Sequence, residues 1–440
     1  MTEEFLWYLW KFRLFDTNEL KTTDGEAIQI LKPGDQNTDS GPDFFNARIK
    51  IGATAWAGNV EIHTRASDWH KHKHTSDKAY DNILLHVVNE ADVKLHRRNG
   101  EPIPTLEMKD RIPKPVYGKY LQFRSSRGWI PCEKQISSVD KFTLNNCLDR
   151  LLVERLERKS KAILDSLQQN KNNWEETFYQ QIAKAFGYKV NAGPFELLAR
   201  AVPASVLGKH RNSLAQIEAL LFGTAGMLEG KFKDDYPKAL QKEFRFLKQK
   251  FNLKPLDVSL WKFMRLHPPG FPTIRISQFS SLFYGSSHLF SKILESASMK
   301  EIVSLFSTHT TEYWVTHFRF DKKSGNRKKT LGADTINIII INTIVPFLFI
   351  YGKEKGEEKF CDRALSLLEK LDPENNSIIS KWNSIGVPAK NAGDTQALLQ
   401  LKNEYCSKKR CLECSVGGKL LDQTKAGPEQ LHSTSPVHPS

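Results

Sequence analysis

The chain has 440 residues, of which 40% are hydrophobic and 10% aromatic, a composition that excludes an intrinsically disordered protein and allows two or three domains. Its 64 Lys and Arg residues outnumber its 50 Asp and Glu residues, so its formal net charge at pH 7 is +14. This surplus of positive charge favours a polyanionic partner, and nucleic acid is the partner we expect.

The sequence shows no sign of export or of membrane insertion. Residues 1–7 lack the cationic start and the long apolar stretch of a signal peptide. The most apolar run, residues 336–350, is interrupted by Asn337, Asn342 and Pro346, so we interpret it as a buried helix and expect no membrane partner. Six cysteines in so long a chain do not make a disulfide framework. We therefore expect a cytoplasmic protein, and the sequence leaves its oligomeric state open.

The N-terminal part alternates between helical and strand patterns. Apolar residues at helical spacing predict an opening helix over residues 3–15. Strands are predicted over residues 27–31, 43–51, 56–64 and 83–88. Ser67 can cap a helix over residues 68–81. The order of helix, three strands, helix and strand predicts a mixed α/β domain with helices on the faces of its sheet.

The rest of the chain is mainly helical by pattern. A segment rich in Pro and Arg, residues 101–136, is typical of a domain boundary, and leucines recur at helical spacing from Leu144 onward. The last residues are rich in Ser, Pro and His. We therefore predict an α/β domain over residues 1–135, a mainly helical domain over residues 136–415 and a disordered tail over residues 416–440.

Acidic residues in the α/β part suggest a metal site. Asp43 begins one predicted strand, and Glu61 and His63 share one face of the next because side chains alternate along a strand. A buried charge without a partner is costly, and a divalent cation is one such partner. Carboxylate oxygens from Asp43 and Glu61 suit Mg²⁺. Alternatively, Glu61 and His63 form a partly solvated pair on an edge strand.

These residues resemble a known motif. Pro42-Asp43 followed by Glu61-Ile62-His63 resembles the PD-(D/E)XK nuclease pattern, and the order of elements is similar to its restriction-endonuclease-like core. The resemblance covers about residues 1–95. It implies a metal-dependent nuclease that hydrolyses phosphodiester bonds of DNA or RNA, with Mg²⁺ or Mn²⁺ held by Asp43 and Glu61.

The same resemblance assigns roles to two more residues. A Glu on the opening helix often completes the site in that superfamily, and we favour Glu4 over Glu3 for this role. His63 stands where the superfamily usually has a Lys that positions the attacking water. We expect His63 to act as an auxiliary base or as a third metal ligand. A catalytically inactive protein that retains the fold and binds nucleic acid or serves as a scaffold is the alternative.

A second resemblance extends over the whole chain. The segments Gly41-Pro42-Asp43-Phe44 and Gly58-Asn59-Val60-Glu61-Ile62-His63, together with the closing Cys-Leu-Glu-Cys, resemble a bacterial family of unknown function. That family implies no activity.

A second polar group follows the first along the chain. On the predicted helix, His70, His74, Asp77 and Asp81 are spaced four, three and four residues apart and share one face. Histidines at this spacing can bind a metal, so a hydrolase of a small substrate that uses His70, His72, His74 and Asp77 is a further alternative. A solvated helix rich in His and Lys is the other interpretation.

Three cysteines lie close together near the C-terminus. Cys406, Cys411 and Cys414 have a spacing that indicates Zn²⁺ or iron–sulfur ligation in a reducing compartment. Such a site needs a fourth ligand, and Cys361 is favoured over Cys132 and Cys147. The alternative is a set of reduced thiols without a metal.

Overall fold

A computed structural model of the chain describes residues 1–264, 266–286 and 288–423, which form two compact units. The first comprises Met1–Leu148, Lys381–Val387 and the described residues from Leu399 onward. The second comprises Asp149–Ser380 and Pro388–Leu398. The first unit is therefore assembled from three stretches of chain, and its division from the second does not follow the predicted boundaries at residues 135 and 415.

The first unit combines a mixed sheet with helices. Its helices and strands are α1 (Glu3–Phe12), β1 (Ile28–Lys32), β2 (Asp35–Gln36), β3 (Phe44–Ile51), β4 (Thr54–Arg65), α2 (Asp68–Lys71), η1 (His74–Ser76), η2 (Lys78–Tyr80), β5 (Ile83–Glu90), β6 (Thr105–Glu107), α3 (Lys114–Ser125), η3 (Ile136–Ser138), η8 (Leu401–Cys406), η9 (Cys411–Glu413) and α18 (Ser415–Asp422). Helix α18 falls within the predicted tail, and residues 424–440 of that tail lie outside the described residues.

The sheet has the strand order β1-β3-β4-β5-β6, and β2 pairs with β3 at its side. The pairs β1–β3 and β3–β4 are antiparallel, and the pairs β4–β5 and β5–β6 are parallel. The mixed α/β class predicted for this region is therefore confirmed. The parallel pairing makes β4 an interior strand, so its polar residues are enclosed and do not lie on a solvated edge.

The burial of β3 and β4 explains how these strands form. Along β3, Ala47, Ile49 and Ile51 are buried and the residues between them are exposed, which is the alternation of a half-buried strand. The second half of β4 is buried on both faces, from Val60 to His63. One of these faces is covered by α1, so Glu61 and His63 lie in the interior.

Helix α1 packs through an apolar stripe that includes Phe5, Leu9 and Trp10, all of which are fully buried. Acidic residues in its first turn and a lysine in its last turn suit the helix dipole. The helix ends at Arg13, which adopts a left-handed conformation and donates its backbone N–H to the last carbonyls. This end comes before residue 15, where the sequence pattern placed it.

The second unit is mostly helical, as the sequence predicted. Its elements are α5 (Trp174–Phe186), α6 (Tyr188–Ala201), α7 (Ala204–Gly208), α8 (Leu214–Thr224), α9 (Asp235–Phe251), η4 (Val258–Leu260), η5 (Pro268–Gly270), α10 (Pro272–Gly285), α11 (Leu289–Glu295), α12 (Met299–Leu305), η6 (Glu312–Val315), β7 (His317–Arg319), β8 (Lys322–Lys323), α13 (Ala333–Ile339), η7 (Ile340–Ile344), α14 (Val345–Lys355) and α15 (Glu358–Lys370). The helices α4 (Lys141–Gln169), α16 (Ser377–Ser384) and α17 (Ala392–Gln400) cross the division between the units.

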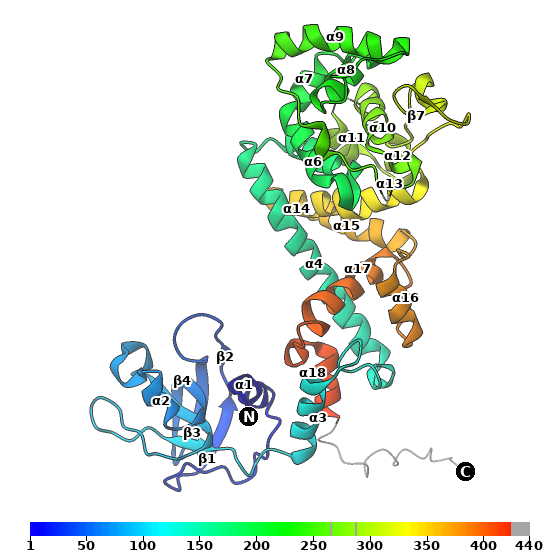
Figure 1. Ribbon diagram of the computed structural model, residues 1–440. Coiled ribbons are helices and arrows are strands. Elements are labelled where there is room, and N and C mark those ends of the chain that lie inside the picture. Colours follow the sequence, from blue (N-terminus) through cyan, green and yellow to red (C-terminus); the bar gives the residue numbers. More distant parts are fainter. Residues whose placement is uncertain (265, 287, 424–440) are drawn as a thin grey trace, which may run out of the picture. The chain divides into compact units, whose positions relative to one another are not determined.

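Helices α13, η7 and α14 form one continuous apolar helix, Ala333–Lys355, in the core of the second unit (Figure 1). Within the described part of the chain, this is the one helix whose length and composition would allow it to cross a membrane. The most apolar window of the helix is 72% buried by the protein itself. This burial agrees with the core helix expected from the apolar run at residues 336–350.

Candidate active site

The pairing of β3 with β4 brings Asp43 and Glu61 together. Asp43 directly precedes β3, and Phe44 pairs with Val60 of β4. The backbone N–H of Asp43 donates to Oε2 of Glu61 at 3.2 Å, and the N–H of Ile62 donates to Oδ2 of Asp43 at 2.8 Å. The two carboxyl groups predicted to share a metal therefore lie side by side.

Three histidines gather beside these carboxyls. His63 lies two residues after Glu61 on β4, and its Nε2 lies 3.5 Å from Oε1 of Glu61 and 3.0 Å from Nδ1 of His72. Nε2 of His74 lies 3.1 Å from the same Glu61 oxygen. Ring nitrogens of His63, His72 and His74 all lie within 4.8 Å of one another. The structure therefore brings His72 and His74 of the second predicted group next to Glu61 and His63 of the first.

Only part of the second predicted group belongs to this site. The continuous helix expected over residues 68–81 is broken into α2, η1 and η2, because Lys73 adopts a left-handed conformation at φ 60°. The break separates His70 and Asp77, both exposed, from His72 and His74, so the predicted single helical face is wrong. Asp77 instead caps η2 by accepting the N–H of Ala79 at 2.9 Å.

On the opening helix, Glu3 lies near these groups, whereas the favoured Glu4 does not. Glu3 is half-buried and interacts electrostatically with His72, Asp68 and His74. Glu4 is exposed, and it interacts with Arg124 instead. Residues 3 and 4 differ by about 100° around a helix, so only one of them can face the sheet.

The carboxyls are difficult to ionise in the metal-free protein. Burial, and then repulsion by Glu61, raise the pKa of Asp43 well above its ordinary value. Burial also raises the pKa of Glu61, and the charge of Glu3 adds to this effect. Three acidic groups in one enclosed place disfavour each other's charge, and a bound cation would relieve this repulsion.

The histidines are held neutral by their surroundings. Burial, together with the neighbouring imidazoles, lowers the pKa of His63 to about 2. Burial likewise lowers the pKa of His86 on β5 to about 3 and lowers the pKa of His74. A neutral imidazole can bind a metal or accept a proton. It cannot supply the positive charge of the Lys that the PD-(D/E)XK pattern has at the position of His63.

Sequence reasoning missed several residues of the site. His86 pairs with Glu61 across β4 and β5, and its Nε2 lies 2.8 Å from Nδ1 of His63, so it orients that ring. The ring of Tyr80 stacks on His74 with centroids 3.8 Å apart. Trp7, one helical turn after Glu3, lies close to Asp43. The shared helical face of Glu3 and Trp7 was the signal that could have identified Glu3.

The cysteines that lie near Cys406, Cys411 and Cys414 do not include Cys361. Cys361 lies on α15 in the second unit, where its thiol is 3.3 Å from the carbonyl oxygen of Phe349. Cys132 instead lines one hollow with Cys406, Cys411 and Cys414 of the first unit, and Cys147 contacts Cys414. Cys361, the predicted fourth ligand, therefore belongs to the other unit, whereas Cys132 shares the hollow of the three C-terminal cysteines.

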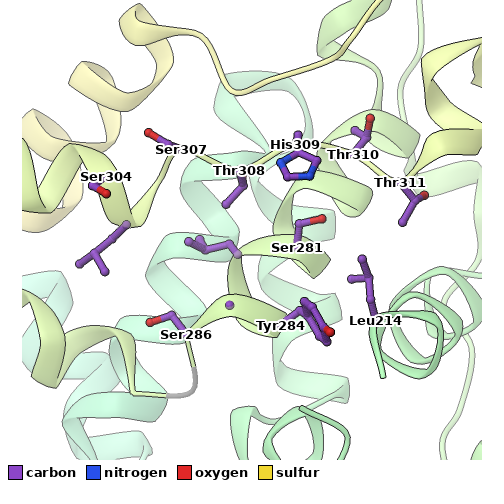
Figure 2. Close-up of a pocket in the computed structure, with 13 residues that line it drawn as sticks. Leu214, Ser281, Tyr284, Ser286, Ser304, Ser307, Thr308, His309, Thr310 and Thr311 are labelled. Atoms are coloured by element: carbon purple, nitrogen blue, oxygen red, sulfur yellow. The ribbon is translucent and has the colours of Figure 1, made fainter. Parts of the chain in front are cut away.

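A hydroxyl-lined cavity of about 410 Å³ lies in the second unit (Figure 2). Ser281 and Ser286 lie on one wall, and Thr308 and Thr310 lie on the other. These four buried hydroxyls have no hydrogen-bond partner in the described part of the chain. The described residues of the lining include one histidine, His309, and no carboxylate, so the cavity has fewer groups for acid–base or metal chemistry than the site in the first unit.

Comparison with known proteins places the chain in a family. The model of one protein family matches residues 3–377. No curated protein and no solved structure matches the chain. Because the matched residues make up most of the chain, it belongs to the family described as "Protein of unknown function (DUF2851)".

Proposed function

We propose that this protein is a metal-dependent nuclease whose active site is formed by Glu3, Asp43, Glu61, His63 and His74. The observation that carries the proposal is the convergence of three carboxyl groups and a cluster of imidazoles at one place in the sheet. Enclosed carboxyls with raised pKa values and a specific set of charged neighbours are typical of functional sites.

The residues present fit a divalent cation. Nε2 of His74 lies 3.1 Å from Glu61, yet it has no hydrogen-bond partner of good geometry among the described residues. His74 is only 8% exposed, so this nitrogen is a buried donor atom without a proton-sharing partner. Asp43 and Glu61 would hold the ion through oxygen, and His74 and His63 are available to hold it through nitrogen.

This mixture of donors narrows the choice of metal. Mg²⁺ prefers oxygen ligands and water, whereas imidazole suits transition metals. Mn²⁺ accepts both carboxylate and imidazole, so we favour Mn²⁺ over Mg²⁺ for a set of two carboxylates and two imidazoles. A metal bound here would supply a nucleophilic water and neutralise negative charge on the phosphate.

The protein's own groups would position the reactants. The carboxyl of Glu61 accepts the backbone N–H of Asp43, and that of Asp43 accepts the N–H of Ile62, which gives both carboxyls defined directions. Glu3, on α1, is placed to accept a proton from an attacking water. His72 is exposed and touches His63, so it is the imidazole at the mouth of the site that a phosphate can reach. His86 holds the ring of His63 from the interior side.

The order of elements supports the finer assignment of the fold. The sequence of α1, β1, β3, β4, α2 and β5 is the helix, three strands, helix and strand that the resemblance to the PD-(D/E)XK superfamily implies. The carboxylates occupy the matching places, with Glu3 on the first helix, Asp43 before β3 and Glu61 on β4. We take this agreement as support for a restriction-endonuclease-like core.

The substrate we propose is DNA or RNA. The net charge of +14 favours a polyanion, and phosphodiester hydrolysis is chemistry that a carboxylate-bound Mn²⁺ or Mg²⁺ performs. Nothing in the described residues selects between the two nucleic acids, so both belong in the assay.

The test compares three variants in a cleavage assay with labelled DNA and RNA, each with Mn²⁺ and with Mg²⁺. We expect Glu61→Ala to lower the rate by at least about a hundredfold, and Glu3→Gln by about ten- to a hundredfold, because both change the metal and water environment. The matched control is Glu4→Gln, which removes the same charge from the same helical turn on its exposed side and should retain full activity.

Three other outcomes of the cleavage assay would contradict the proposal, and each supports a different conclusion. Equal cleavage by wild type and Glu61→Ala would mean that a contaminating nuclease causes the activity. Tight nucleic-acid binding without cleavage under every metal would support the inactive scaffold. Hydrolysis of p-nitrophenyl phosphate without cleavage of either polymer would support the small-substrate hydrolase, in which His72 and His74 are the distinctive groups.

A further inference from the structure

The hollow formed by four cysteines of the first unit is separate from the carboxylate site in its residues and in its chemistry. Cys132 follows α3, Cys406 ends η8, Cys411 begins η9 and Cys414 directly precedes α18. Two stretches that are distant in sequence therefore place four thiols around one space. Among the described residues, the rest of the lining comes from Phe123, Pro131, Tyr405, Arg410 and Gly417.

The chain between Cys406 and Cys414 turns sharply to bring its sulfurs together. Lys409 adopts a left-handed conformation at φ 53°, and the N–H of Arg410 returns to the carbonyl of Tyr405 at 3.0 Å. A straight helix would spread these cysteines over different faces. The turn therefore accounts for their convergence.

Gly417 allows α18 to approach this turn closely. A Cβ atom added at Gly417 would lie 2.1 Å from the carbonyl oxygen of Cys411, a distance that no real Cβ contact allows. The same glycine donates its backbone N–H toward the sulfur of Cys414 at the start of α18. Backbone N–H groups at a helix N-terminus stabilise a thiolate, and hydrogen bonds to sulfur tune metal-bound thiolates.

Several cations surround the hollow. Lys402 interacts with Cys406, Lys409 with Cys411 and Lys119 with Cys132, each in the direction that favours a negatively charged sulfur. In the metal-free protein, burial still raises the pKa of Cys132 to about 12 and that of Cys411 to about 11. Four thiolates around one hollow would repel one another, and a cationic centre between them would relieve this repulsion.

The spacing of the sulfurs distinguishes between kinds of centre. A single zinc ion with Zn–S bonds of about 2.3 Å draws its four sulfurs to about 3.8 Å from one another. Within the described residues, the three potential ligand atoms found within 4.8 Å of one another are those of His63, His72 and His74. Among the described residues, no three cysteine sulfurs lie within 4.8 Å of one another, which is compatible with ligands that bind different iron atoms of one cluster.

We propose that Cys132, Cys406, Cys411 and Cys414 bind an iron–sulfur cluster. The cluster would join the segment after α3 to the C-terminal segment from η8 to α18, and so stabilise the association of the first and last stretches of the first unit. This site shares no residue with the proposed nuclease centre, and each proposal stands if the other fails.

The test uses the full chain, expressed without an affinity tag, purified without oxygen and reconstituted with Fe²⁺ and sulfide. We expect a brown protein with about two or about four iron atoms per chain and an equal amount of inorganic sulfide. Cys132→Ser should lose the colour and most of the iron. Cys361→Ser, in the second unit, is the matched control and should keep both.

Folding is monitored separately, by circular dichroism and by gel filtration. If Cys132→Ser does not fold, Cys411→Ser provides the comparison and should likewise lose the iron, and the iron and sulfide content of the wild type alone still decides. One zinc per chain, no iron after reconstitution, or an iron content unchanged in a folded Cys132→Ser variant would each overturn the proposal.

Discussion

The carboxyl group of Glu61 has a different partner at each oxygen. Oε2 accepts the N–H of Asp43, and Oε1 faces the ring nitrogens of His63 and His74. Because both imidazoles are held neutral, neither gives Glu61 a counter-charge in the metal-free protein. The residues proposed to bind a metal are in this way unfavourable to the stability of the protein without one.

We therefore expect Glu61→Gln to stabilise the metal-free protein at neutral pH. The pKa values of Asp43 and Glu61 are raised, so from about pH 4 upward the folded protein holds more protons than the unfolded chain, and its free energy of unfolding falls as the pH rises. The variant removes one of these carboxyls. Its gain in the free energy of unfolding should be roughly 1 to 2 kcal/mol at pH 8 and should vanish near pH 4.

Urea denaturation in EDTA at both pH values measures this gain. Glu4→Gln is the control, since Glu4 is exposed, and it should change the free energy of unfolding by less than about 0.5 kcal/mol. If the Glu61→Gln protein has a lower free energy of unfolding than the wild type at pH 8, the loss of hydrogen bonds to the carboxyl outweighs the relief of electrostatic repulsion, which contradicts the prediction.

The site residues differ in how far the sequence could reveal them. Asp43 and Glu61 were predictable, because two consecutive strands joined by a short turn pair as a hairpin and bring their polar residues together. Glu3 was not separated from Glu4, although Trp7 one turn later marks the face that meets Asp43. The role of His86 depends on the parallel pairing of β4 with β5, which a strand pattern does not specify.

At the scale of elements, β4 and β5 are held together by a close approach at Gly58. A Cβ atom on Gly58 would lie 2.7 Å from Cδ2 of Leu84 and 3.0 Å from the carbonyl oxygen of Asn82. This approach lies at the start of the paired region, two residues before Val60, where the register that joins Glu61 to His86 begins. The glycine is therefore important for packing and for the site alike.

Gly58→Val should accordingly reduce stability and metal affinity together. We expect a loss of about 1 to 3 kcal/mol in the free energy of unfolding, because the added side chain overfills the space between the strands. Mn²⁺ affinity, measured by isothermal titration calorimetry, should fall at least about tenfold. Gly118→Ala on α3 is the control: nothing lies within 4 Å of its added Cβ, so the helix should be unchanged or slightly more stable. Unchanged Mn²⁺ affinity in a folded Gly58→Val protein would contradict this link.

Elements also show where pattern reasoning fails. The spacing of His70, His74, Asp77 and Asp81 fits a helix, but the left-handed Lys73 ends α2 after one turn. The interruption is stabilised by tertiary contacts, since Trp69 donates its indole N–H to Thr75 at 3.0 Å and Tyr80 stacks on His74. Such contacts override helical periodicity, and they turn His74 inward toward Glu61.

At the scale of the whole molecule, the first unit gathers three stretches of the chain. Sequence composition could place a boundary near the Pro- and Arg-rich segment, but it could not show that residues after Leu399 return to the N-terminal unit. That return depends on long-range contacts, such as the bond from Nζ of Lys402 to the carbonyl of Trp129 at 2.8 Å. The family and the mainly helical second region were predictable, because they rest on patterns within continuous segments.

The positive charge of the whole chain leads to a prediction about binding. Helix α9 in the second unit carries Lys238, Lys242 and Arg245 at spacings of four and three, so these exposed side chains follow one face. Phe246 is exposed beside them, with 61% of its surface accessible. A cationic face with an exposed aromatic ring suits a phosphate backbone and its bases.

We therefore expect binding of a fluorescent single-stranded oligonucleotide in EDTA to weaken linearly with the logarithm of salt concentration. Each phosphate contact contributes a slope of about −0.7 on single strands, so the triple variant Lys238→Glu, Lys242→Glu and Arg245→Glu should bind at least about tenfold more weakly and with a shallower slope. The matched control replaces Lys353, Lys355 and Lys359, also exposed in the second unit, with Glu and thus makes the same change in net charge. If the two triple variants lose affinity equally, the overall charge of the chain governs binding and α9 is not the contact. If only the α9 variant loses affinity, the nucleic acid contacts this helix, and the EDTA in the assay ensures that the loss does not come from the metal site proposed in the first unit.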